Sequence, residues 1–191
     1  MTELIREVAE SEGSRISEIG ELTALAYLAD GLVDQAHPYL VALRDARARA
    51  KSAHLLMMSD GEGGAGAIVG TLTVVPPGSP FIEVAGPEEF EFRMLAVSPI
   101  ERGRGLGEKL TRAGMDFAVE RGAKRVVLST MSHMHSAHRL YERLGFTRRT
   151  DLDWLVVDHP DGSVSRVPAG EAGAADKGIQ LIGYSWDPSS R

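Results

Sequence analysis

The chain has 191 residues, of which 43% are hydrophobic and 25% are charged, and this balance excludes the disordered and fibrous classes of protein. Its net charge of −6 argues against a general nucleic-acid or membrane-surface binder, and the absence of cysteine excludes disulfides, thiolate metal sites and a cysteine nucleophile. Because no stretch approaches the roughly 18 apolar residues of a membrane span, we expect a cytoplasmic protein with no membrane partner and no nucleic-acid partner.

Strands and helices are predicted in turn along the first half of the chain. The hydrophobic pattern predicts a strand over 4–10, a helix over 16–30, a helix over 38–53, strands over 54–59 and 67–75, a proline-rich loop over 76–87 and a strand over 89–98. The glycine-rich stretch 61–66 is typical of a hairpin turn, with phosphate binding as the alternative. In the strand over 89–98, Phe90, Phe92 and Met94 are expected to share one face.

The second half predicts a helix over 105–121, a strand over 125–131, a short helix over 137–144, strands over 153–158 and 179–186, and a polar loop over 159–177. This order of elements predicts a mixed α+β sheet with helices on its faces. The length favours a single domain over 1–191. Trp154 and Trp186 lie on the last two strands, where core packing is the simpler interpretation and a place in a pocket the alternative.

The most informative string is MLAVSPIERGRGLGEKL, in which a strand ends and a glycine-spaced turn leads directly into a helix. Because glycines remove side chains from such a turn, successive backbone N–H groups at the start of the helix can point at an anion such as a pyrophosphate. Two arginines add positive charge. The residues of this candidate anion-binding turn are Arg102, Gly103, Arg104, Gly105, Leu106 and Gly107.

Two known phosphate-binding motifs do not fit this turn. A P-loop requires Gly-Lys-Ser/Thr at the start of the helix, whereas here Gly107 is followed by Glu108 and Lys109. A dinucleotide-binding fingerprint requires a third glycine where Glu108 stands. A plain strand-to-helix connection with solvated arginines stays open as the alternative.

The turn resembles the acetyl-CoA signature of the GNAT superfamily of N-acetyltransferases, which reads Arg or Gln, two residues, Gly, one residue, Gly or Ala. Arg102, Gly105 and Gly107 match it. The resemblance covers 89–154 and includes the strings LAVSP, VVLST and AHRLYERLGF. It implies a mixed, mostly antiparallel sheet that is splayed at its middle, with helices on both faces. It also implies acetyl-CoA as co-substrate and no metal.

The resemblance further implies where acetyl-CoA binds. The pantetheine arm is expected to fill the gap between the splayed strands, and the pyrophosphate to lie over 102–107. A backbone N–H near Leu95 is placed to polarise the thioester carbonyl. The residues expected along the arm are Leu95, Ala96, Val97, Ser129, Thr130, Ala137 and Leu140.

Two catalytic side chains are nominated by the same resemblance. Tyr141 matches the tyrosine that donates a proton to the departing thiolate, and a core aromatic is its alternative. Glu91 is the candidate base that removes a proton from the amine; a solvent-facing glutamate is the structural alternative, and a nearby histidine or water is the chemical one. Met134 stands where an asparagine is frequent in the family, which puts a polar contact to the cofactor in doubt.

Charged residues near the motif give two further expectations. Glu83, Glu88 and Glu89 have no basic residue beside them in the sequence, so they predict an acidic lip that favours a cationic amine, or else a loop of solvated glutamates. The histidines at 133, 135 and 138 are not expected to bind metal, because no cysteine or carboxylate in this string completes a ligand set.

The resemblance thus implies an enzyme that transfers acetyl from acetyl-CoA to a primary amine, most simply of a small molecule, and the absence of cysteine favours direct attack in a ternary complex. The alternative is a non-catalytic acyl-CoA-binding or sensing module with the same fold. A homodimer is an expectation by analogy, since dimers are frequent in the superfamily.

Overall fold

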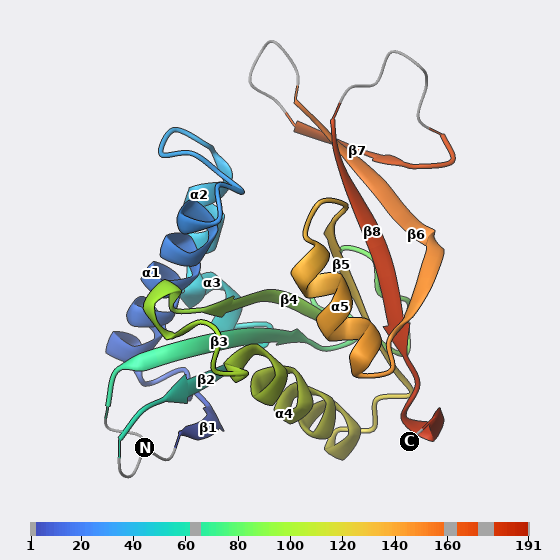
Figure 1. Ribbon diagram of the computed structural model, residues 1–191. Coiled ribbons are helices and arrows are strands. Elements are labelled where there is room, and N and C mark those ends of the chain that lie inside the picture. Colours follow the sequence, from blue (N-terminus) through green and yellow to red (C-terminus); the bar gives the residue numbers. More distant parts are fainter. Residues whose placement is uncertain (1–2, 62–65, 159–163, 172–177, 191) are drawn as a thin grey trace.

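Eight strands form one sheet in the order β1-β2-β3-β4-β5-β8-β6-β7 (Figure 1). The computed structural model describes residues 3–61, 66–158, 164–171 and 178–190. Its helices and strands are β1 (Leu4–Glu7), α1 (Gly13–Ala29), α2 (Tyr39–Arg44), α3 (Ala46–Ala50), β2 (His54–Ser59), β3 (Ile68–Val75), β4 (Glu89–Val97), α4 (Leu106–Glu120), β5 (Arg125–Met131), α5 (His135–Arg143), β6 (Thr147–Asp158), β7 (Val164–Pro168) and β8 (Ile179–Trp186). Neighbouring strands are antiparallel except β4 and β5, which are parallel, so the predicted mixed, mostly antiparallel sheet is confirmed.

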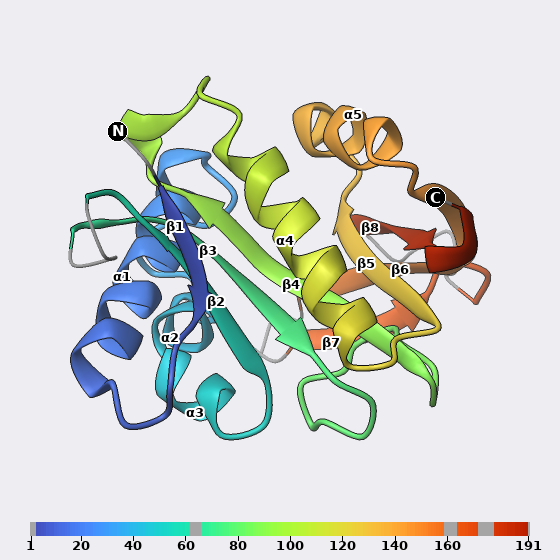
Figure 2. The same ribbon diagram turned by 90° about the horizontal axis from the view of Figure 1, so that it is seen from below.

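The helices cover both faces of the sheet, as predicted. Along β2, Leu56 and Met58 pack in the core cluster that contains α4 residues, whereas Leu55 and Met57 pack in a separate cluster with α1. This period of two is what a strand buried on both faces requires. Helices α1, α2 and α3 therefore lie on one side of β2–β4 and α4 lies on the other (Figures 1 and 2).

The predicted helix over 38–53 is instead two short helices, α2 and α3, which meet at Asp45. Asp45 has a ψ of 61°, outside the helical region, and its carboxylate accepts a hydrogen bond from the N–H of Ala48 at 2.9 Å, so it caps α3. The buried Arg49 donates to the carbonyl oxygens of Ala42 and Leu43 at the end of α2. Burial lowers the pKa of Arg49 to about 10.

The expectation that Met94 shares a face with Phe90 and Phe92 is wrong. Met94 has a positive φ of 52°, and the pairing of β3 with β4 shifts register between Thr71 and Thr73. Such an irregularity turns the following side chains to the opposite face. Phe90 and Phe92 therefore pack on the α4 side, whereas Met94 joins the cluster of α1 and α2.

The C-terminal part of the sheet is larger than predicted. Strand β6 begins at Thr147 and not at residue 153, and β7 occupies part of the predicted polar loop over 159–177, where it pairs antiparallel with β6. The sequence pattern did not predict β7, because a strand of five residues within a stretch rich in glycine and acidic residues shows little hydrophobic periodicity. The rest of that loop, 159–163 and 172–177, and the centre of the glycine-rich stretch, 62–65, lie outside the described residues. The remaining predicted elements are confirmed to within three residues at either end.

Candidate functional site

Strands β4 and β5 separate at the middle of the sheet. They pair from Glu89 with Arg125 to Phe92 with Leu128, and no pairing follows, although β4 runs on to Val97 and β5 to Met131. Beyond this point β4 pairs only with β3, and β5 only with β8. The predicted splay of the central strands is confirmed, and it opens the sheet between residues 93–97 and 129–131.

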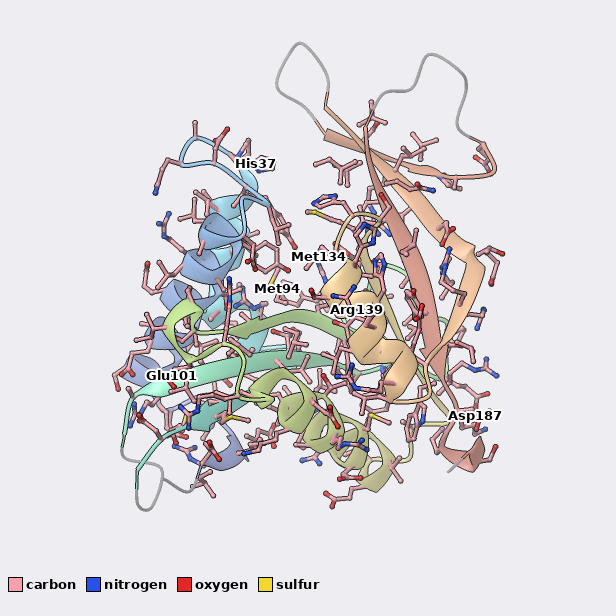
Figure 3. All side chains as sticks on the ribbon, viewed as in Figure 1. His37, Met94, Glu101, Met134, Arg139 and Asp187 are labelled. Atoms are coloured by element: carbon pink, nitrogen blue, oxygen red, sulfur yellow. The ribbon has the colours of Figure 1, made fainter. Side chains whose placement is uncertain are left out.

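A cavity of about 420 Å³ lies at this opening. Most of its wall comes from the end of α1, the loop to α2 and α2 itself, from β4, from β5 and the turn after it, and from β6, β7 and β8. Single residues of β3, the loop before β4, α4 and α5 complete it. His37, Met94 and Met134, which belong to three of these parts, can be located in Figure 3. Of the residues nominated from the sequence, the cavity is lined by Leu95, Ser129, Thr130 and Tyr141, whereas Glu91, Ala96, Val97, Ala137 and Leu140 are not among its lining residues.

Tyr141 reaches the cavity from α5, where it is packed between aromatic rings. Its ring centroid lies 5.7 Å from that of Phe146 and 6.2 Å from that of Tyr184, and the residue is 8% exposed. No hydrogen bond joins its hydroxyl to the described residues. Burial raises the pKa of the Tyr141 phenol, so the hydroxyl stays protonated at neutral pH and keeps a proton to donate into the cavity.

The glycine turn before α4 has the geometry of an anion-binding site. Gly103 and Gly105 have φ values of 78° and 73°, and a Cβ added at either position would meet no atom within 4 Å. The first N–H groups of α4 have no intrahelical acceptor, as in any α-helix, and no side chain at its N-cap accepts a hydrogen bond from them. At Gly107 an added Cβ would lie 3.7 Å from Leu140 and 3.9 Å from Val97, which brings the start of α4 against α5 and β4. The turn therefore fits a pyrophosphate.

The arginines of the turn form ion pairs with acidic residues far away in the sequence. Arg102 donates through Nη1 to Asp30 Oδ1 at 2.7 Å and through Nη2 to Asp30 Oδ2 at 3.0 Å, which ties the turn to the end of α1. Arg104 donates to Glu3 at 2.9 Å and also contacts Glu101. The local sequence gives no sign of Asp30 or Glu3 as partners, because the fold alone brings them to the turn.

Glu91 is fully buried, so the interpretation as a solvent-facing glutamate is wrong. Its Oε2 accepts hydrogen bonds from the backbone N–H groups of Glu83, Val84 and Ala85 at 2.8, 3.0 and 3.1 Å, whereas its Oε1 has no partner among the described residues. Burial raises the pKa of the Glu91 carboxyl. In this structure Glu91 therefore fixes the backbone of the loop that precedes β4.

The acidic lip predicted from Glu83, Glu88 and Glu89 is wrong, because each of these glutamates has a cationic partner from another segment. Glu83 alone among them lines the cavity. The ion pairs are Glu83 with Arg93 at 2.5 Å, Glu88 with Lys124 at 2.6 Å and Glu89 with Arg125 at 3.0 Å. A count of charges over neighbouring residues in the sequence therefore overestimates the negative charge around these three glutamates.

Several cavity residues were not predicted. Arg93 of β4, Arg166 of β7 and Tyr39 of α2 line it, and so does Trp154, for which the pocket was the less favoured interpretation. Trp186 is in the core, as the simpler interpretation held. The only sequence signal for Arg93 was its alternation with the phenylalanines of β4. Arg166 had no signal, because β7 was not predicted.

Met134 also lines the cavity, and the Thr130 hydroxyl lies 3.5 Å from its sulfur. The side chain at position 134, where many family members have an asparagine, is therefore a thioether that lines the cavity. The described residues hold no group of three or more side chains that could bind a metal ion. Within the same residues, no helix combines the length and the apolar character needed to cross a bilayer.

Comparisons with known proteins find acetyltransferases. The model of the acetyltransferase (GNAT) family matches residues 19–146. N-alpha-acetyltransferase 30 of Schizosaccharomyces pombe is 46% identical over 55 residues, which cover 29% of this chain and 37% of that protein. Mycothiol acetyltransferase of Streptosporangium roseum is 45% identical over 58 residues, which cover 30% of this chain and 17% of that protein. The matches thus span well under two thirds of these curated relatives.

The solved structures match nearly the whole chain, whereas these two curated relatives match less than a third of it. The yncA protein of Salmonella typhimurium, solved with its cofactor acetyl-CoA, has a TM-score of 0.63 at 18% identity over 98% of this chain and 94% of that one. The ribosomal-protein-S18-alanine N-acetyltransferase of Escherichia coli has a TM-score of 0.60 at 16% identity over 97% of this chain and 94% of that one. At such low identity this likeness concerns the fold.

Proposed function

Because the chain belongs to the acetyltransferase (GNAT) family, we propose that it is an enzyme that transfers the acetyl group of acetyl-CoA to a primary amine of a small molecule. The observation that carries the proposal is the separation of β4 and β5 beyond Phe92 and Leu128, at the site of a cavity that Tyr141 lines. We further propose that residues 1–191 form a single acetyltransferase domain.

Acetyl-CoA is proposed to bind across the open part of the sheet. The turn 102–107 binds the pyrophosphate through backbone N–H groups, and the pantetheine arm pairs with the unpaired backbone of β4 near Leu95. Support for this placement comes from the open surroundings of Gly103 and Gly105 and from Ser129 and Thr130, which line the opposite wall.

The proposed reaction is a direct attack of the amine on the thioester carbonyl. A bond forms between the amine nitrogen and the carbonyl carbon, the carbon–sulfur bond breaks, and the electron pair of that bond goes to sulfur. Tyr141 donates its proton to the departing thiolate and regains one from solvent. A backbone N–H near Leu95 stabilises the negative charge that develops on the carbonyl oxygen. No cysteine exists to form an acetyl-enzyme.

The amine must lose a proton before it attacks. The sequence nominates Glu91 as the base, but its carboxylate is buried and already accepts three backbone N–H groups. Glu83 lines the cavity, and only its Oε1 is engaged by described residues. We therefore propose that Glu83 takes the proton, directly or through water, and that Glu91 positions the loop that carries Glu83.

A two-step experiment tests the proposed function. The first step measures the thermal unfolding midpoint with acetyl-CoA, with NAD and ATP as controls; a ligand at one hundred times its Kd adds about 2.7 kcal/mol of stability and shifts the midpoint by several degrees. The second step measures thiol release with a panel of primary amines. Binding without turnover over the panel would identify an acyl-CoA-binding or sensing module. No selective shift in folded protein would remove acetyl-CoA from the proposal.

A further inference from the structure

The cavity contains an arginine whose charge is not balanced at close range. Arg166 comes from β7, and its side chain is 42% exposed. Its Nη2 donates to the backbone carbonyl of Glu83 at 3.3 Å, but the nearest carboxylate oxygen, Glu83 Oε1, is 3.9 Å from its Nη1. That distance is too long for a hydrogen bond. Arg166 therefore keeps donors that the described residues do not satisfy.

The negative charge of Glu83 is engaged by a different arginine. Arg93, whose side chain is 11% exposed, approaches Glu83 Oε1 to 2.5 Å through Nη2, and its Nη1 donates to the carbonyl of Phe81 at 2.8 Å. The described residues that line the cavity include three with an Asp, Glu, Lys or Arg side chain: Glu83, Arg93 and Arg166. Among the lining residues one positive charge is thus left in excess, and we place it on Arg166, because Arg93 is the arginine paired with Glu83.

The ring of Trp154 packs against the guanidinium of Arg166. The Arg166 Cζ lies 3.9 Å from the centroid of the Trp154 ring, a cation–π contact. The Trp154 indole Nε1 is buried and has no hydrogen-bond partner among the described residues, although Trp154 lines the cavity at 8% exposure. The Trp154 ring thus provides one face of contact for the guanidinium, and Arg166 is the group in this part of the wall that can bind an anion.

The rest of the cavity wall is largely apolar or aromatic. Its apolar and aromatic lining includes Tyr27, Leu32, Val33, Met94, Met131 and Leu181. Such a surface accommodates a hydrocarbon or aromatic group and excludes a second charged one. A volume of about 420 Å³ limits the ligand to a small molecule or a chain end.

From these contacts we propose that the acetyl acceptor is an amino acid with an apolar side chain. Its carboxylate binds the guanidinium of Arg166 beside Trp154, its amine lies next to Glu83, and its side chain fills the apolar part of the cavity. Glu83 Oε1 and Arg166 Nη1 are 3.9 Å apart, so one ligand can place an amine beside Glu83 and a carboxylate beside Arg166 only if the two groups are close together, as they are in an amino acid. Planar guanidinium groups bind carboxylates through two parallel hydrogen bonds, which favours Arg166 as the recognition group. This inference rests on the proposed acetyl transfer.

Three related amines test it: phenylalanine, phenylalaninamide and phenethylamine, compared by thiol release from acetyl-CoA. Phenylalanine is expected to have a kcat/KM roughly 10- to 100-fold above the other two, the range for hydrogen bonds to a charged group. Phenylalaninamide resembles the N-terminus of a peptide, so a preference for it would overturn the inference and indicate a peptide acceptor. Equal use of phenylalanine and its amide would also overturn it, while acetyl transfer would stand.

An arginine variant links the preference to its residue. R166Q is expected to lower kcat/KM for phenylalanine roughly 10- to 100-fold and to remove the discrimination against phenylalaninamide. R121Q is the matched control, because the Arg121 Cζ also stacks on an aromatic ring, that of Phe117 at 3.4 Å, but outside the cavity. A preference that survives in R166Q would overturn the assignment of Arg166. No thiol release with any amine, in protein that binds acetyl-CoA, would remove the proposed enzyme function and this inference with it.

Discussion

The carboxylate of Glu91 holds the backbone of Glu83, whose N–H donates to Glu91 Oε2 at 2.8 Å. Two further N–H groups, of Val84 and Ala85, bond to the same oxygen. The loop before β4 therefore has a fixed path, and that path puts Glu83 into the wall of the cavity beside Arg93. Glu91, which is buried and does not line the cavity, thus determines the position of the Glu83 carboxylate in the cavity wall.

Replacement of Glu91 by alanine is expected to lower the free energy of unfolding by about 1–3 kcal/mol, because three N–H groups of the loop lose their acceptor. E91Q keeps one acceptor oxygen and should lose less. Urea denaturation of both variants measures the difference. Equal stability of E91A and the wild type would show that the loop does not depend on this carboxylate.

The same position separates a positioning role from a base. We expect E83Q to lower kcat roughly 10²- to 10⁴-fold, the range for loss of a general base, and E91Q to lower kcat less, because the Glu91 carboxylate does not line the cavity. Steady-state rates with the same primary amine measure both effects. A larger loss of kcat in E91Q than in E83Q would return the base to Glu91, as the sequence alone predicts.

The sequence predicted those parts of the molecule that depend on neighbouring residues. The helix over 105–121 and the strand over 125–131 have clear periodicity, and the glycine turn and Tyr141 belong to contiguous strings. Their positions follow from local chemistry: glycines permit the left-handed backbone at Gly103 and Gly105, and the 3.6-residue period turns Tyr141 inward with Leu144.

The parts that could not be predicted depend on contacts between distant segments. The charge of Glu83 is balanced by Arg93, ten residues away, because a strand and the preceding loop meet, and Arg166 reaches Glu83 only through β7. Met94 changed face because of a bulge that no periodicity reveals. Sequence reasoning therefore predicted the glycine turn before α4, but not the part of the cavity wall that Glu83 and Arg166 form.

Gly105→Ala is expected to weaken acetyl-CoA binding by more than about tenfold, since a Cβ at this left-handed residue strains the turn that presents the N–H groups. Gly122→Ala is the matched control: Gly122 has a φ of 82°, a Cβ there would also meet nothing within 4 Å, and it lies beyond the far end of α4. Both variants should lose about 1–2 kcal/mol of stability. Calorimetric titration with acetyl-CoA separates them, and equal affinities would argue against the turn as the binding site.

Stability at low pH is expected to depend on Glu12. Its hydrogen bond to Arg6 lowers the pKa of the Glu12 carboxyl to about 2, below the ordinary value near 4.5 that it has in the unfolded chain. Because the folded pKa is the lower one, the stabilisation is complete above about pH 4.5 and is lost as pH falls toward 2. Urea midpoints of the wild type and E12Q should converge over this range. A difference that stays constant from pH 6 to pH 2 would contradict the ion-pair explanation.

Tyr141→Phe is expected to lower turnover roughly 10²- to 10⁴-fold, the range for loss of a general acid, and to leave the stability within about 0.5 kcal/mol, because the hydroxyl has no described hydrogen-bond partner to lose. The control is Tyr184→Phe: the Tyr184 ring lies 6.2 Å from that of Tyr141, but its hydroxyl donates to Glu142 at 3.0 Å and it does not line the cavity. Y184F should therefore lose some stability and keep its turnover. Thiol release at saturating acetyl-CoA and urea denaturation measure the two effects. A Y141F enzyme with the wild-type rate would mean that the thiolate takes its proton from water, and Tyr141 would then serve only to pack α5 against Phe146.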